Sequence, residues 1–101
     1  MKTNITRAEL KQLLNNQNSL MVVDVRSKAE YNEKHIPFAG NLSIELIEAG
    51  NFIPEPGKII VTACGKGGGR SERAAEYLRN NTKNEVYFLD GGTFGWLENE
   101  T

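Results

Sequence analysis

The sequence predicts an α/β fold with a mostly parallel sheet. Two apolar runs rich in β-branched residues, 20–25 and 58–63, have the continuous pattern of strands that are covered on both faces. A third run, 86–89, has a similar composition, and segments with helical patterns separate the three. Strands that alternate with helices are joined by crossovers, so they align in parallel and the helices cover the sheet.

Two capping boxes mark helices in the first third of the chain. Thr6 and Glu9 form the first box, and the leucines that follow repeat at helical spacing until the chain reaches two asparagines at 15–16. Ser27 and Glu30 form the second box. The second helix must end before Pro37, because the residue before a proline avoids helical geometry.

The middle of the chain contains an edge strand, a helix and a turn. Residues 41–43 have the composition of a brief edge strand. Ser43 is placed to cap a helix over 44–49, and Gly50 is placed to end it. Two prolines and a glycine within 54–57 then predict a turn before the strand at 58–63.

A further helix follows the second long strand. Small and apolar side chains at 71, 74, 75 and 78 form one face, and charged side chains cover the other. We expect Ser71 to cap this helix. Residues 80–84 are expected to form a polar loop, and the strand at 86–89 to lead into Asp90-Gly91-Gly92. Sites in open α/β sheets form at the carboxyl ends of strands, so Asp24, Cys64 and Asp90 are expected to border one crevice.

The segment 64–71 carries the candidate chemistry. It begins with Cys64, the only cysteine, and contains four glycines, whose N–H groups can converge on an anion without Cβ clashes. The following helix adds about half a positive charge at its N-terminus. Such a field lowers a cysteine pKa from about 8.5 into a range of roughly 3.5–7.5, which makes the thiolate available as a nucleophile.

Two other interpretations of this segment are weaker. A lone cysteine is often a small buried hydrophobe, but here the glycines and Arg70 accompany it. A phosphate-binding P-loop ends in a lysine followed by Ser or Thr, whereas here Arg70 precedes Ser71 and Lys66 lies within the loop. The sequence therefore disfavours nucleotide binding.

Length and composition restrict the class of protein. With 101 residues we expect a single domain over residues 1–101. Lys and Arg total 12 against 13 Asp and Glu, which suggests neither a nucleic acid nor a membrane as partner. The N-terminal segment lacks the apolar core of a signal peptide, so we expect a cytoplasmic protein. One cysteine provides neither a disulfide nor a multi-cysteine metal site, so we expect no metal or cofactor and an external partner thiol.

Several motifs resemble the signatures of the rhodanese family. The N-terminal signature is matched by 21–26, Glu30-Tyr31, His35-Ile36-Pro37 and Ala39, and the C-terminal signature by 89–92 and Gly95-Trp96. Cys64 falls where the family has its catalytic cysteine. The resemblance implies a rhodanese-like α/β fold with a mostly parallel five-stranded sheet and helices on both faces. It also implies sulfur transfer from a small sulfur-containing anion such as thiosulfate, through a persulfide on Cys64, to a thiol, a protein or cyanide.

Two departures keep alternatives open. Cys64 and Arg70 are separated by five residues, whereas most single-domain sulfurtransferases of the family have four. The longer loop is similar to that of cysteine-dependent phosphatases and arsenate-handling enzymes, although these usually have histidine where this chain has Ala63. Phe38 stands where the family usually has glycine. A non-catalytic persulfide carrier or sensing module is the third possibility.

The candidate site consists of a nucleophile, an anion-binding loop and supporting residues. Cys64 is the candidate catalytic residue. Asp24 and Arg26 are expected to form a supporting network with Glu30, because a buried carboxylate needs partners, and His35 is expected to anchor its loop by hydrogen bonding. Arg70 is expected to orient the anion or to brace the loop against a carboxylate such as Asp24. The candidate substrate-binding residues are Gly65, Lys66, Gly67, Gly68, Gly69, Arg70 and Ser71.

Overall fold

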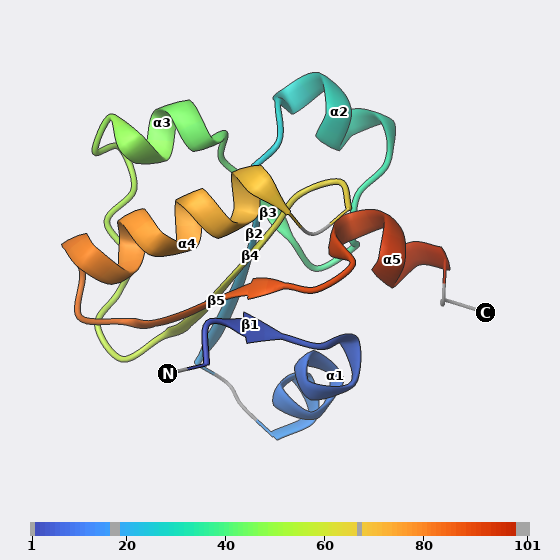
Figure 1. The fold of residues 1–101 in the computed structure, drawn as a ribbon, viewed down its shortest axis with the longest axis horizontal. Helices are drawn as coiled ribbons and strands as arrows, with labels where there is room; N and C mark the ends of the chain where they lie inside the picture. Colours follow the sequence, from blue (N-terminus) through green and yellow to red (C-terminus); the bar gives the residue numbers. More distant parts are fainter. Residues whose placement is uncertain (1, 17–18, 67, 99–101) are drawn as a thin grey trace.

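A computed structural model describes residues 2–16, 19–66 and 68–98, which form a parallel sheet flanked by helices (Figure 1). The elements in chain order are β1 (Asn4–Ile5), α1 (Arg7–Asn16), β2 (Leu20–Asp24), α2 (Lys28–Glu33), β3 (Gly40–Asn41), α3 (Ile44–Glu48), β4 (Ile59–Ala63), α4 (Gly69–Asn81), β5 (Glu85–Leu89) and α5 (Gly92–Glu98). The expectation of an α/β fold with a five-stranded sheet is confirmed.

The five strands have the order β1-β5-β4-β2-β3, and all four pairings are parallel. β4 is therefore central, with β2 and β5 on either side. The three strands expected from apolar runs are these central ones, and their bounds differ from the expected ranges by one residue. β1 was not expected, because two residues carry no strand pattern of their own; it pairs with Phe88 and Leu89 of β5.

Helices cover both faces of the sheet, as expected. On one face, α3 and α4 pack on the strands through Ile44, Ile47, Ala74, Ala75 and Leu78. On the other face, α1 and α5 contribute buried side chains, among them Leu10 and Trp96. Because both faces are covered, the central strands need apolar side chains in both directions, which explains their continuous apolar runs.

The expected caps are mostly present. Thr6 and Glu9 bond each other's backbone N–H groups, and Ser27 and Glu30 form the second capping box. Ser43 caps α3, and Gly50 follows its end with a φ of 84°. The cap at Ser71 is wrong: α4 begins at Gly69 with Gly68 as N-cap, so Ser71 lies inside the first turn.

Within the described part of the chain, no helix has the length and apolar character needed to cross a membrane.

Candidate functional site

Cys64 directly follows the central strand β4 at the carboxyl edge of the sheet. Its side chain is buried, with 5% of the residue surface exposed. The Sγ lies 3.0 Å from the carbonyl oxygen of Gly68 and 3.2 Å from the Oγ of Ser71, and the thiol donates toward these oxygens. Cys64 therefore lies at the edge where open α/β sheets commonly form their sites.

Helix α5 holds the first part of the loop that follows Cys64. The N–H of Thr93 donates to the carbonyl of Cys64 at 2.7 Å, and the N–H of Phe94 donates to the carbonyl of Gly65 at 3.0 Å. A Cβ at Gly65 would lie 3.4 Å from the Phe94 ring, so the backbone there approaches the ring closely. These contacts fix the direction of the first two carbonyls of the loop.

The last part of the loop turns back onto the cysteine. The carbonyl of Gly68 accepts from the N–H and the Oγ of Ser71, both at 3.1 Å, as well as from the thiol. Gly69 has a φ of 21°. The N-terminus of α4 thus begins beside the sulfur, and its partial positive charge favours an anion there. Gly67, an expected substrate-binding residue, lies outside the described residues.

Arg70 pairs with a different carboxylate from the one expected. Its two terminal nitrogens lie 2.9 and 3.2 Å from the oxygens of Glu30 on α2, so Arg70 does brace the loop against a carboxylate, but the partner is Glu30 and not Asp24. Both side chains are exposed, that of Arg70 over 42% of its surface and that of Glu30 over 43%. The bond to Arg70 and then those to Ser27 lower the pKa of Glu30 to about 2, and Glu30 raises the pKa of Arg70. Arg70 therefore links the loop to α2.

Asp24 and Arg26 form a buried ion pair at the end of β2. Asp24 is fully buried, Arg26 is 2% exposed, and the Nη2 to Oδ2 distance is 2.8 Å. The carboxylate also accepts from the backbone N–H of Arg26 and from the hydroxyl of Thr93. The expected pairing of Asp24 with Arg26 is confirmed, but Glu30 pairs with Arg70 instead of joining them.

Thr93 connects this ion pair to Cys64. Its hydroxyl bonds Asp24 at 3.2 Å while its N–H bonds the carbonyl of Cys64. Thr93 thereby joins Asp24 to the backbone of Cys64. The carboxylate of Asp90, directly after β5, accepts from the side-chain amide of Asn4 on β1. Sequence reasoning missed Thr93. Its only signal is its position directly after the Gly91-Gly92 pair, and its contacts depend on how β2, β4 and α5 meet.

His35 lies in the loop after α2 and stacks on Tyr31, with ring centroids 3.8 Å apart. Its Nδ1 donates to the carbonyl of Tyr31 at 2.8 Å, because a carbonyl can only accept. The contact ties the histidine to the preceding helix. The unexpected phenylalanine at 38 is 41% exposed and lies edge-on against Trp96.

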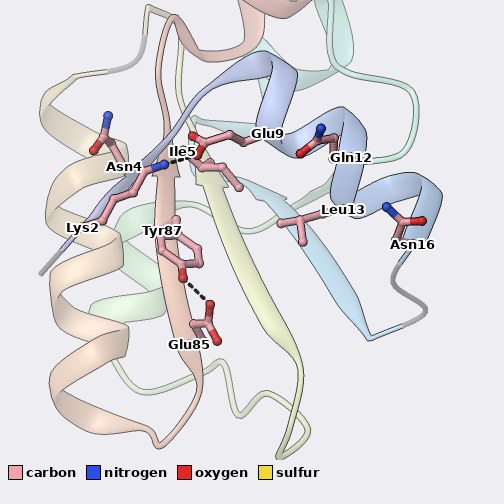
Figure 2. A pocket seen from close by; sticks show the side chains of 9 residues that line it. All are labelled: Lys2, Asn4, Ile5, Glu9, Gln12, Leu13, Asn16, Glu85 and Tyr87. Atoms are coloured by element: carbon pink, nitrogen blue, oxygen red, sulfur yellow. Dashed lines mark hydrogen bonds and ion pairs between the residues drawn. The ribbon is translucent and has the colours of Figure 1, made fainter.

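Another pocket lies away from Cys64, on the outer edge of the sheet (Figure 2). It has a volume of ≈ 340 Å³ and is lined from β1, α1 and β5, with Glu85 and Tyr87 toward the start of β5. Lys2 pairs with Glu9, and the Tyr87 hydroxyl donates to Glu85. The bond to Lys2 lowers the pKa of Glu9 to about 2, and the bond to Glu85 raises the pKa of Tyr87. These polar groups bond one another, so the pocket is not the candidate site.

The structure is thus that of an α/β protein with a single cysteine at the end of a central parallel strand, followed by a glycine-rich loop. Comparison with known families identifies the class: the rhodanese-like domain family matches residues 6–99. The chain belongs to this family.

Individual relatives agree with this assignment. A thiosulfate sulfurtransferase, GlpE, of Shewanella oneidensis is 35% identical over 82 residues, which are 79% of this chain and 78% of that protein. A rhodanese-like domain protein from Staphylococcus aureus, of solved structure, is 32% identical to this chain with a TM-score of 0.77. The matched region is 95% of this chain and 91% of that protein's chain. An uncharacterized protein of Synechocystis is 30% identical over 96% of this chain, which spans 54% of its length.

Proposed function

We propose that this protein is a sulfurtransferase that moves sulfane sulfur from an anion such as thiosulfate to a thiol or cyanide through a persulfide on Cys64. The observation that supports it best is the placement of the lone cysteine, buried at the end of β4 and facing the first turn of α4. The match to a thiosulfate sulfurtransferase over four fifths of the chain supports the same chemistry.

The first half-reaction forms the persulfide. The thiol of Cys64 loses its proton to solvent, and the thiolate attacks the outer sulfur of thiosulfate. A new S–S bond forms while the bond in thiosulfate breaks, and sulfite leaves with the electron pair. Once the thiol proton is gone, Gly68 has no hydrogen to accept from the sulfur. The hydroxyl of Ser71, 3.2 Å away, can then turn from Gly68 and donate to the thiolate.

The loop binds the anion in this proposal. The backbone N–H groups of Gly65, Lys66, Gly68 and Gly69 and the N-terminus of α4 stabilise its negative charge. Lys66 adds an exposed point charge, and Arg70 adds a guanidinium that Glu30 holds beside the loop. Asp24, Arg26 and His35 are positioning residues, because they act through the backbone around the site.

Mass spectrometry of the intact protein tests the proposal. After incubation with thiosulfate and removal of small molecules, we expect the wild-type mass to rise by one sulfur atom, and this increase to disappear after cyanide is added. The Cys64→Ala variant should show no increase and no thiosulfate-to-cyanide turnover, with an unchanged circular dichroism spectrum. Turnover by Cys64→Ala would contradict the proposal. An adduct that forms in the wild type without turnover would indicate a persulfide carrier.

A second candidate function is favoured by the length of the loop. Five residues separate Cys64 from Arg70, which resembles the spacing in cysteine-dependent phosphatases and arsenate-handling enzymes. In that case the Cys64 thiolate would attack the phosphorus of a phosphate ester, whose alcohol leaves, or the arsenic of arsenate, whose hydroxide leaves, and Arg70 would turn from Glu30 onto the anion. Hydrolysis of p-nitrophenyl phosphate, and reduction of arsenate with an added thiol as the reductant, measured in the wild type and in Cys64→Ala, test it. Activity with either substrate that depends on Cys64, without persulfide formation, would support this candidate over the first.

A further inference from the structure

Thr62 is a buried polar residue in the central strand of the sheet. It interrupts the apolar run of β4 and has no exposed surface. Side chains alternate between the two faces of a strand, so Thr62 points to the same face as Ile60 and Cys64, which is the face that α4 covers. A hydroxyl buried on this face needs a hydrogen-bond partner there.

The partner of Thr62 is the backbone of α4. Its Oγ1 lies 2.8 Å from the carbonyl oxygen of Ser71 and 3.5 Å from that of Tyr87. A hydroxyl has one hydrogen to donate, and the shorter contact, to Ser71, is the better bond. In an α-helix the same carbonyl also accepts from the N–H four residues further on. The bond from Thr62 is therefore an additional one, which joins the strand to the helix.

Ser71 connects this bond to the nucleophile. Its Oγ lies 3.2 Å from the Sγ of Cys64, and both its N–H and its Oγ donate to the carbonyl of Gly68. Ser71 is itself completely buried. Thr62 thus holds, by the backbone, the residue whose side chain contacts the sulfur.

The apolar contacts of α4 do not fix its position as closely. The helix packs on the sheet through Ala74, Ala75 and Leu78. Two of these side chains are very short, and apolar burial has no preferred direction, so a small sliding of the helix over the strands costs little. A hydrogen bond, in contrast, weakens steeply when its geometry changes. The bond from Thr62 is therefore suited to set where the first turn of α4 lies along β4.

We propose that Thr62 is a positioning residue, whose hydroxyl holds the first turn of α4 beside Cys64 so that the helix N-terminus and the Ser71 hydroxyl stabilise the thiolate. The positive end of a helix acts over about one turn, so a small displacement weakens its effect on the sulfur. Arg70, whose charge interacts with that of Cys64, lies in the same turn and moves with it. The consequence for persulfide formation rests on the proposed function.

The ultraviolet absorbance of the thiolate, followed against pH, measures the pKa of Cys64. Because this is the only cysteine, the same protein with Cys64→Ala supplies the blank for each variant. Thr62→Val keeps the branched shape and removes the hydroxyl, and it should raise the thiol pKa by about half a unit. The rate of persulfide formation from thiosulfate should fall about three- to tenfold.

A second pair of variants separates the hydroxyl from packing. Thr62→Ser keeps the hydroxyl and loses a buried methyl group, so it should retain the wild-type thiol pKa but unfold at a lower urea concentration. Thr62→Ala loses both groups, and its thiol pKa should rise as in Thr62→Val. The thiol pKa should thus follow the hydroxyl, whereas stability should follow mainly the methyl group.

Thr82→Val is the matched control at the other end of α4. It removes a hydroxyl that donates to the carbonyl of Leu78 at 2.6 Å. Thr82 is eleven positions beyond Ser71, about 16 Å along the helix, so the thiol pKa should not change. The proposal would be overturned by an unchanged thiol pKa in Thr62→Val, or by equal shifts in Thr62→Ser and Thr62→Ala.

The failure of this inference is separable from that of the proposed function. If wild-type Cys64 gains no sulfur from thiosulfate, the proposed function is wrong, and the absorbance titrations still decide the role of Thr62. If the persulfide forms equally fast in the wild type and in Thr62→Val, and the thiol pKa does not follow the hydroxyl, the role of Thr62 alone is wrong.

Discussion

At the scale of single residues, the ion pairs differ in how much water they lose. Asp24 and Arg26 are almost completely buried, and the carboxylate accepts from Arg26 and Thr93. Arg70 with Glu30 is an exposed pair. A buried charge that loses its partner cannot be compensated by water, whereas an exposed one can. The two pairs should therefore respond very differently to substitution.

Replacing Arg26 with methionine should lower the free energy of unfolding by about 3–5 kcal/mol, because it leaves the charge of Asp24 buried and unpaired. Urea denaturation followed by circular dichroism measures this loss. Arg73→Gln is the matched control, since Arg73 pairs with Glu48 while 60% of its side chain is exposed. The control should cost less than about 1 kcal/mol. Equal effects of the two substitutions would contradict the difference in burial.

At the scale of elements, the short helix α2 depends on its caps and on its contact with the loop. Glu30 accepts from the N–H and the Oγ of Ser27 and also pairs with Arg70, so one carboxylate closes the capping box and joins α2 to the start of α4. A helix of six residues cannot hold itself together by its own hydrogen bonds. The Glu30 carboxylate is therefore one of the groups that fix α2 against the site.

The pH dependence of stability should report this role. Because the pKa of Glu30 falls to about 2 in the folded protein, its contribution to stability is present above the ordinary pKa of about 4.5. That contribution is lost as the pH falls from about 4.5 to about 2. The decline in the free energy of unfolding over this interval should be shallower in Glu30→Gln than in the wild type. Glu33→Gln, which removes an exposed carboxylate from the same helix, is the control for the loss of one negative charge.

At the scale of the whole molecule, two cores on opposite faces of the sheet hold the helices in place. Adjacent residues of β4 serve different cores, since Ile60 packs with α3 and α4 while Val61 packs with α1 and α5. The position of Cys64 at the end of this strand depends on both cores. Exposed side chains outside the two cores do not help to hold the helices or Cys64 in place. Ile53, with 90% of its surface exposed, is an example.

Ile60→Ala should lower the free energy of unfolding by about 2–5 kcal/mol, because it removes a fully buried side chain and leaves a cavity in the centre of the sheet. Ile53→Ala removes the same atoms from an exposed position and should change stability by no more than about 0.5 kcal/mol. Denaturant titrations of both variants measure the comparison. A loss below about 1 kcal/mol for Ile60→Ala would indicate that the core relaxes around the missing atoms.

The sequence by itself determined the three central strands, the starts of the first two helices and the position of Cys64. The apolar runs predicted β2, β4 and β5 because strands covered on both faces need apolar residues throughout. The capping boxes predicted the starts of α1 and α2, since a cap depends on residues three positions apart. The position of Cys64 at the end of β4 followed from where the apolar run ends and the glycines begin.

The tertiary structure alone decided the pairing of β1, the start of α4 and the distant partners of Arg70 and Thr93. β1 exists because its two residues pair with β5, and Ser71 lies inside α4 because that helix begins at Gly69, within the loop. The partner of Arg70 is Glu30, 40 residues away in the sequence, and Thr93 reaches Asp24 across 69 residues. Local patterns reflect forces that act within a few residues of the chain. Which distant side chains meet at the site depends on how helices pack on the sheet, and no pattern within a single segment contains that information.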